Sequence, residues 1–265
     1  IISKSRQSST KCRKRLRTNF PAVPPKSSEN ILLRMQTVYM VDYRKLRPGN
    51  LNSPEFKHLL LLLYWPIYGA VFWLLERGLS LNYHAVEADL DAKIPFCEFF
   101  VFPYYFWFVF LVGIHLYTLF FDIPAFKKLM YFIIITYTIT TVIYIFYPTK
   151  QELRPTEFQR DNFCVDIVKA LYNFDTNTNV CPSLHVIGSF AVYFTTLYCK
   201  PLRTPLWQTV LIILTVLISI STVFLKQHSI IDIIAALAVC AVAFPFAYIL
   251  PDRIKSHNAA AKETA

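Results

Sequence analysis

Five uncharged, mostly apolar runs constrain the fold of this chain more than any other feature. They cover residues 59–75, 99–121, 129–147, 204–225 and 233–250. A helix needs about 20 such residues to cross the hydrocarbon core of a bilayer. A sixth run, 186–199, is shorter, but the uncharged stretch that contains it begins at residue 176. Because 55% of the chain is hydrophobic, we predict an all-α polytopic membrane protein, a six-helix transmembrane bundle.

The distribution of charge predicts three parts of the chain. Residues 1–57 carry 13 Lys and Arg against three acidic residues, which accounts for the net charge of +10. We expect a basic, partly disordered cytoplasmic tail that contacts anionic lipid headgroups. Its basic run 11–17, "KCRKRLR", is not expected to bind nucleic acid, because no aromatic residue lies within this run to stack on bases. Residues 58–250 form one membrane domain, since no repeat or Gly/Ser linker divides them, and residues 251–265 are a short tail.

Both ends of the chain have features of added sequence. The C-terminal "AAAKETA" resembles a remnant of an affinity tag, and residues 1–34 precede the first methionine-led segment, at Met35. Cytoplasmic loops of membrane proteins collect Lys and Arg, so an inside N-terminus places three loops outward. These are residues 76–98, which hold five acidic residues, residues 148–185, and the tight turn 226–228.

The three outward segments contain the polar residues that suggest chemistry. They are Lys150 and Arg154 after the third span, Ser183 and His185 before the fourth, and Lys226, His228 and Asp232 between the fifth and the sixth. Guanidinium and ammonium groups neutralise phosphate oxygens, and imidazoles perform nucleophilic attack and proton transfer. The set therefore suits a phosphate ester.

The spacing of His228 and Asp232 indicates how they would act together. Four residues apart on a helix, they share one face, where the carboxylate fixes the tautomer of the ring and leaves its other nitrogen free to attack phosphorus. Taken singly, Asp232 can be a helix cap, His185 a helix-start residue, and Lys150 and Arg154 interfacial anchors. Their coincidence on one membrane face favours a site.

Cysteine spacing gives no sign of a metal site. The six cysteines form no CxxC pair and no Cys/His cluster with zinc-ligand spacing, and no acidic cluster offers ligands for magnesium. We therefore predict no metal site. Cys164 and Cys181 share the long outward loop, where a disulfide can form, but free thiols are expected.

Three short stretches resemble a known family. "CPSLH" (residues 181–185) and "STVFLKQHSIID" (residues 221–232) resemble the second and third signature motifs of the type 2 phosphatidic acid phosphatase superfamily, and "KQELRP" resembles a shortened first motif. The resemblance implies a six-span lipid phosphatase or phosphotransferase that needs neither a metal nor an organic cofactor. It makes His228 the nucleophile that becomes phosphohistidine, Asp232 its partner and His185 the acid for the leaving group. Its implied phosphate ligands are Arg154, Ser183 and Ser221.

The motifs depart from the family pattern at three positions. Lys150 stands four residues before Arg154 instead of seven, Leu184 replaces a glycine, and Thr222 replaces an arginine. We expect Lys226 and Lys150 to supply phosphate-binding charge. The PSLH form and the Ser-Thr start also resemble the inositol phosphorylceramide synthase branch, which transfers a phospho-headgroup to a lipid alcohol.

The predicted function is hydrolysis of a phosphomonoester or pyrophosphate lipid, with headgroup transfer as the alternative. Two non-enzymatic readings stay open, namely a small transporter with intramembrane His, Lys and Asp, and a bis-histidine haem protein that uses His115 and His185. The aromatic stretch 94–108 is expected to form an interfacial belt, with Glu98 as a candidate headgroup contact. The expected partners are the bilayer and a membrane lipid substrate, in a bacterial plasma membrane with the site facing outward. The sequence indicates no oligomeric state.

Overall fold

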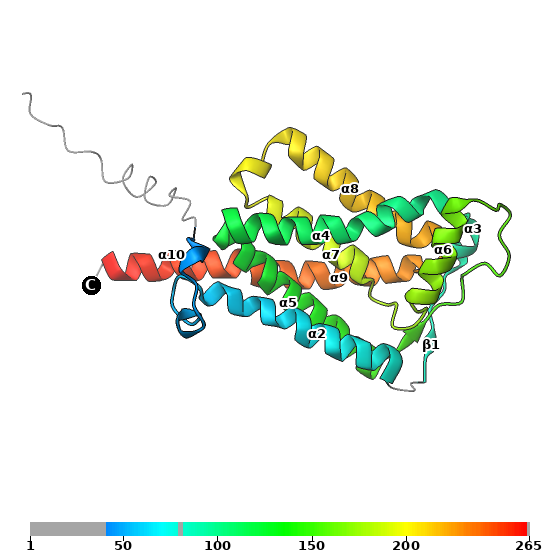
Figure 1. The fold of residues 1–265 in the computed structure, drawn as a ribbon, viewed down its shortest axis with the longest axis horizontal. Coiled ribbons are helices and arrows are strands. Elements are labelled where there is room, and N and C mark those ends of the chain that lie inside the picture. Colours follow the sequence, from blue (N-terminus) through cyan, green and yellow to red (C-terminus); the bar gives the residue numbers. More distant parts are fainter. Residues whose placement is uncertain (1–40, 79–81, 264–265) are drawn as a thin grey trace, which may run out of the picture. The chain divides into compact units, whose positions relative to one another are not determined.

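The computed structural model describes residues 41–78 and 82–263, and its secondary structure is almost entirely helical (Figure 1). The helices are α2 (Tyr64–Trp73), α3 (Asp89–Lys93), α4 (Val101–Phe121), α5 (Ile123–Phe146), α6 (Phe163–Phe174), α7 (Leu184–Thr196), α8 (Pro205–Phe224), α9 (Ile230–Phe244) and α10 (Leu250–Glu263). A 3-10 helix, Lys57–Leu63, precedes α2 and a π turn, Leu74–Gly78, follows it; a second π turn, Pro245–Ile249, joins α9 to α10. Two short strands, β1 (His84–Ala85) and β2 (Thr149–Lys150), pair in parallel.

Side-chain caps fix where several helices begin. Asp122 accepts a hydrogen bond from the amide of Ala125 (3.1 Å) at the start of α5, and Thr204 accepts one from the amide of Trp207 (3.4 Å) at the start of α8. Both helices have a proline in the first turn, where no intrahelical donor is lost. Within the apolar runs, a helix provides hydrogen-bond partners for its own backbone N–H and C=O groups. The hydrocarbon of a bilayer cannot provide such partners.

The chain is an all-α polytopic membrane protein. Five of its described segments are long and apolar enough to cross a membrane, namely Lys57–Arg77, Glu98–Phe121, Ile123–Phe146, Pro205–Phe224 and Ile230–Ile254. The predicted sixth span corresponds to α7, which has 13 residues. At about 1.5 Å per residue this helix is shorter than the hydrocarbon core of about 30 Å. Six full-length spans are therefore not confirmed.

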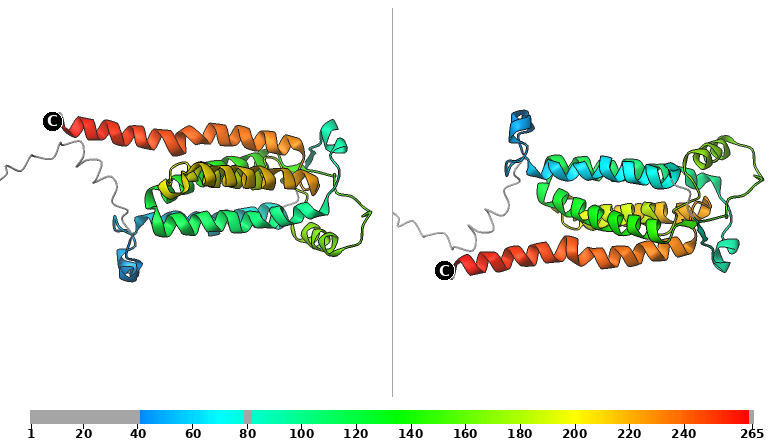
Figure 2. Two further views of the ribbon diagram at one scale, coloured as in Figure 1. Left: turned by 90° about the horizontal axis from the view of Figure 1, so that it is seen from above. Right: turned by 90° about the horizontal axis from the view of Figure 1, so that it is seen from below.

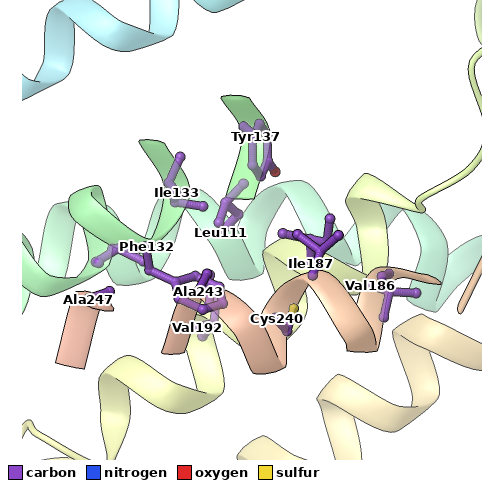
Figure 3. Close-up of a cluster of buried hydrophobic side chains, with 14 of the residues drawn as sticks. Leu111, Phe132, Ile133, Tyr137, Val186, Ile187, Val192, Cys240, Ala243 and Ala247 are labelled. Carbon is purple, nitrogen blue, oxygen red and sulfur yellow. The ribbon is translucent and has the colours of Figure 1, made fainter. Parts of the chain in front are cut away.

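The position of α7 explains why a short helix suffices there. It packs against α4, α5, α8 and α9, and its apolar side chains lie in the largest core cluster of the described residues (Figure 3). In that cluster Ile187 and Val192 of α7 lie among Phe132 of α5 and Cys240 of α9. A helix that its neighbours surround does not have to match the thickness of the lipid.

One end of the bundle gathers the segments that carry the predicted motifs. Helices α4, α7 and α9 begin there and helices α5 and α8 end there, while β1, α3 and α6 lie beyond them (Figures 1 and 2). We call this end the motif end. Strand β1 comes from the loop after α2 and β2 comes directly after α5, so the strand pair joins two interhelical loops.

Contacts at the opposite end fasten both terminal regions. The Tyr43 hydroxyl donates to the carbonyl of Leu119 (2.7 Å) and contacts His58 Nε2 (2.8 Å), which attaches residues 41–58 to α4. Lys128 Nζ donates to the carbonyl of Tyr248 and to Asp252, both at 2.8 Å. Residues 251–263 of the predicted C-terminal tail continue the last helix. Residues 1–40, most of the predicted disordered tail, lie outside the described residues.

The described cysteines are free thiols, as expected. They are Cys97, Cys164, Cys181, Cys199 and Cys240.

Candidate active site

A tight turn between α8 and α9 presents His228. Helix α8 ends at Phe224, and Lys226 then takes a left-handed backbone conformation with φ 53°, which costs a non-glycine residue about 1–2 kcal/mol. The carbonyl of Thr222 accepts the amides of Gln227 (2.9 Å) and His228 (3.1 Å). Ser229 then caps α9, because its hydroxyl accepts the amide of Ile231 at 3.2 Å. The turn is thus fixed on both sides of the histidine.

His228 and Asp232 form a buried pair. His228 Nδ1 lies 3.0 Å from Asp232 Oδ2, which also accepts the amide of Ser229 at 3.0 Å. Asp232 is fully buried, and His228 is 8% exposed. A hydrogen bond to the carboxylate places the imidazole proton on Nδ1 and leaves the lone pair of Nε2 free. The structure therefore contains the predicted contact between the Asp232 carboxylate and the His228 ring.

His185 lies in an aromatic slot one helix away. Its ring centroid is 4.2 Å from that of Tyr104 and 4.5 Å from that of Trp107, both on α4, and 6.0 Å from that of His228. Gly188, one turn further along α7, makes this packing possible. A Cβ atom there would stand 2.8 Å from Trp107 Nε1, so a larger residue would displace the indole.

The two serines of the predicted site differ in their surroundings. The amide of Ser183 donates to the carbonyl of Asp232 at 3.2 Å, which places this serine beside the His228–Asp232 pair. Ser221 is fully buried in α8, and its hydroxyl donates to the carbonyl of Ile218 at 2.6 Å. The structure therefore brings Ser183 to the site and pairs the Ser221 hydroxyl within its own helix.

Arg154 is held by backbone carbonyls. Its Nη2 donates to the carbonyls of Asp175 (2.7 Å) and Thr176 (2.9 Å) and to Gln227 Oε1 (2.5 Å), and the guanidinium stacks 4.5 Å from the Tyr172 ring. Burial lowers the pKa of Arg154, and the charge of Asp175 opposes this shift. Gln227 directly precedes His228 in the sequence, so this hydrogen bond brings the Arg154 guanidinium to the turn that carries His228.

The two predicted lysine ligands have protein partners. Lys150 pairs with Glu152 and lowers the pKa of that carboxyl. Lys226 Nζ donates to the carbonyls of Asp91 (2.6 Å) and Ile94 (2.5 Å), and burial lowers its pKa. Phosphate binding by these two lysines stays a prediction.

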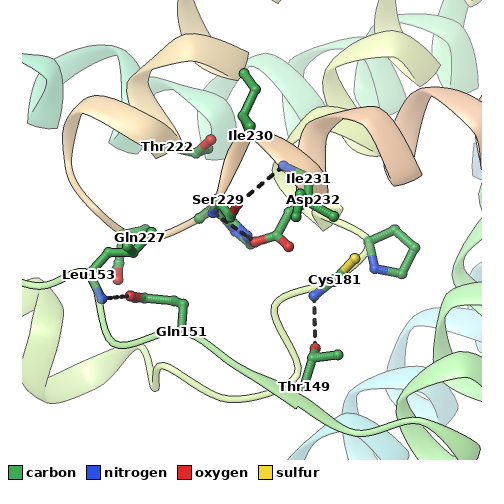
Figure 4. A network of polar contacts seen from close by, with 12 residues as sticks. Thr149, Gln151, Leu153, Cys181, Thr222, Gln227, Ser229, Ile230, Ile231 and Asp232 are labelled. Atoms are coloured by element: carbon green, nitrogen blue, oxygen red, sulfur yellow. Dashed lines mark hydrogen bonds and ion pairs between the residues drawn. The ribbon is translucent and has the colours of Figure 1, made fainter. Parts of the chain in front are cut away.

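Polar contacts tie the three motif segments together. Gln151 Nε2 donates to the carbonyl of Lys226 at 2.8 Å, and the amide of Cys181 donates to Thr149 Oγ1 at 3.1 Å. Figure 4 shows Cys181 between Asp232 and Thr149, with Leu153 of the first motif segment near Gln227 of the third. Segments from three separate loops thus meet at one place, as the sequence predicted.

Four buried polar atoms of the site have no hydrogen-bond partner within the described residues. They are Arg154 Nε, Ser183 Oγ, His185 Nε2 and Asp232 Oδ1. Buried polar atoms are costly unless they are paired, and a phosphate group would offer acceptors to the first two. Residues 41–78 and 82–263 contain no cluster of three or more His, Cys, Asp or Glu that could hold a metal ion.

The haem reading gains no support from the histidine neighbours. His115 Nδ1 contacts the carbonyl of Leu111 at 2.7 Å, and its ring packs on Trp65, whereas His185 lies against Tyr104 and Trp107. Those two aromatic residues were missed as site residues. They fall in the aromatic stretch 94–108, and no spacing rule separates such residues from a lipid-facing belt.

Comparisons with known proteins agree with the motif reading. No curated protein and no solved structure matches the chain. The family model described as "PAP2 superfamily" matches residues 125–256, about half of the chain, and this range contains every site residue that the motifs predicted. The inositol phosphorylceramide synthase branch stays a prediction. Because the motifs and the family model agree, the chain belongs to the PAP2 superfamily, the type 2 phosphatidic acid phosphatases and their relatives.

Proposed function

We propose that this protein hydrolyses a phosphomonoester or pyrophosphate lipid through a phosphohistidine intermediate. Membership of the PAP2 superfamily supports phosphatase- or phosphotransferase-type activity on lipid phosphates. The observation that carries the specific proposal is the His228–Asp232 pair, with a second histidine ring 6.0 Å away.

In the first half-reaction, His228 Nε2 attacks phosphorus and the bond from phosphorus to the lipid oxygen breaks. Protonated His185 donates its proton to that oxygen, so the lipid leaves as an alcohol, or as a lipid phosphate when the substrate is a pyrophosphate. Asp232 stabilises the positive charge that forms on the His228 ring. Ser183 Oγ and Arg154 Nε, which have no hydrogen-bond partner within the described residues, donate to the phosphate oxygens.

In the second half-reaction, neutral His185 takes a proton from water, which attacks phosphorus and breaks its bond to His228. The alternative is attack by a lipid alcohol on an intermediate that carries a phospho-headgroup. The aromatic enclosure of His185 by Tyr104 and Trp107 supports this alternative, because it limits the access of water. Mass spectrometry of the products, with and without an added lipid alcohol, distinguishes the two.

The roles of the two histidines are separable by experiment. His228→Ala removes the covalent path, so both lipid turnover and labelling by a radioactive phosphate donor should disappear. His185→Ala should lose about 10²–10⁴-fold in rate with a lipid phosphate. It should retain more activity with nitrophenyl phosphate, whose leaving group needs little help from an acid.

A matched control is available at the other end of the bundle. His257 is exposed on α10, and His257→Ala should keep the wild-type rate. Asp232→Asn should cost orders of magnitude, by analogy with the roughly 10⁴-fold loss when a protease triad loses its orienting carboxylate. Labelled phosphoenzyme in His228→Ala would contradict the proposal.

We also expect the reaction to need no divalent ion. Two histidines and an arginine already supply the nucleophile, the acid and positive charge. Activity in excess EDTA should therefore equal activity in magnesium. Complete loss in EDTA that magnesium restores would show that the site works by a different mechanism.

A further inference from the structure

The loop between α2 and α4, residues 76–98, contacts all three motif segments. It carries five acidic residues and lies outside the range that the family model matches. Three of these residues, Glu76, Asp91 and Glu98, accept hydrogen bonds from side chains of other loops. The remaining two, Glu87 and Asp89, are exposed and make no side-chain hydrogen bond or ion pair within the described part of the chain. The acidic character of the loop is therefore divided between two kinds of residue.

Asp91 holds the turn that presents His228. Its side chain, in a residue 1% exposed, accepts the Ser229 hydroxyl (2.6 Å) and the amide of Ile230 (2.9 Å). Its carbonyl accepts Lys226 Nζ at 2.6 Å. Asp91 thus binds the turn on both sides of His228, at Lys226 and at Ser229 and Ile230. It also orients the Ser229 hydroxyl that caps α9.

Glu76 holds the segment that leads to His185. Its Oε1 accepts Asn179 Nδ2 at 2.7 Å, and its Oε2 accepts the hydroxyls of Thr178 (3.1 Å) and Thr176. Asn179 has a left-handed backbone, with φ 50°, so this segment adopts a conformation that needs external support. The Glu76 carboxylate supplies this support at Asn179, two residues before Cys181 in the chain.

The same loop contacts the first motif segment through its backbone. Strand β1 pairs with β2, where Ala85 lies opposite Lys150, and the amide of Val86 donates to the carbonyl of Lys150 at 2.8 Å. Glu98 accepts Arg160 (3.1 Å) and Asn162 (3.0 Å) beyond that segment. Glu98, the candidate headgroup contact, is thus engaged within the protein.

We propose that Glu76 and Asp91 are positioning residues, each for a different histidine. The inference rests on the proposed function, since it assigns Asp91 to the nucleophile His228 and Glu76 to the acid His185. Carboxylates are suited to this task because one group accepts several donors from a turn whose backbone lacks regular partners. A displacement of about 1 Å at a reacting group can cost about 10²-fold in rate.

The two substitutions should have different dependences on the leaving group. Asp91→Asn replaces one of the two accepting carboxylate oxygens by an NH₂ group, which cannot accept a hydrogen bond from the Ser229 hydroxyl or the amide of Ile230. The turn with the nucleophile His228 should therefore shift. We expect kcat to fall about 100-fold with both the lipid phosphate and nitrophenyl phosphate, with KM nearly unchanged. Glu76→Gln disturbs the acid, so kcat should fall at least 10-fold with the lipid phosphate and much less with nitrophenyl phosphate. A purely structural role would lower both rates together in both variants, and this result would overturn the proposal.

Matched controls come from the same loop. Glu87→Gln and Asp89→Asn remove the same charges at exposed positions and should keep wild-type rates. If Asp91→Asn does not fold, Ser229→Ala removes the hydroxyl contact with Asp91 together with the Ser229 cap of α9, keeps the contact of Asp91 with the amide of Ile230, and should lower kcat by a smaller factor with both substrates. Wild-type kinetics in Glu76→Gln, or in whichever of Asp91→Asn and Ser229→Ala folds, would also overturn the assignment.

Amide hydrogen exchange tests the positioning without any turnover. Asp91→Asn should lower protection at Ser229 and Ile230, and Glu76→Gln should lower it at Asn179 and Cys181, each at least 10-fold and without change in the α5 core. If wild-type protein neither hydrolyses nor becomes labelled, the proposed function fails while this measurement still decides the positioning. Unchanged protection at both segments would contradict the role of the two carboxylates.

Discussion

At the scale of single residues, Cys181 reports on the site without taking part in the proposed reaction. Burial and the charge of Asp232 raise the pKa of its thiol from an ordinary 9.0 to about 12. At pH 8 the thiolate fraction is then about a thousand-fold smaller than that of an unperturbed cysteine, and the thiolate is the reactive form. Because the pKa is raised, Cys181 should be alkylated more slowly at neutral pH than an ordinary cysteine, and its alkylation rate should rise with pH.

The prediction concerns a variant that keeps Cys181 as its only cysteine. Its alkylation by iodoacetamide should be far slower at pH 8 than that of a cysteine peptide, and should rise about tenfold per pH unit up to pH 11. Adding Asp232→Asn removes the neighbouring charge and should speed the reaction at pH 8. A rate at pH 8 equal to that of the peptide would show that the thiol does not lie beside a buried carboxylate.

At the scale of helices and loops, the sequence predicted the elements with strong local signals. Uncharged runs predicted the long helices, because hydrocarbon leaves a chain few other ways to pair its backbone. The spacing of His228 and Asp232 predicted their contact, which is local to one turn. The helix α7 was less predictable, since its length depends on the neighbours that cover it.

Long-range partners were the part that sequence reasoning could not supply. Lys150 and Lys226 were expected to face a phosphate, but their ammonium groups have partners in Glu152 and in the 91–94 segment. Nothing local in the sequence links Lys226 to Asp91, which lies 135 residues away. The acidic composition of loop 76–98 is evident from the sequence. Only the fold, however, distinguishes the three carboxylates that accept hydrogen bonds from other loops from the two that are exposed.

At the scale of the whole protein, the two ends of the bundle differ in charge. The end of the bundle opposite the motif end carries Lys127, Lys200 and Arg203, whereas the motif end carries the acidic loop 76–98. Lys and Arg are enriched in cytoplasmic loops. We therefore propose that the motif end faces away from the cytoplasm, so that substrate enters from the outer leaflet.

This orientation predicts the labelling of two single cysteines in an otherwise cysteine-free protein. Asp89→Cys, at the motif end, should react with a membrane-impermeant maleimide in intact cells. Lys200→Cys, at the opposite end, should react only after the membrane is permeabilised, because the bilayer separates it from the reagent. Both positions are exposed, so each serves as the accessibility control for the other. The reverse pattern would place the site on the cytoplasmic side and make inner-leaflet lipids the substrates to assay.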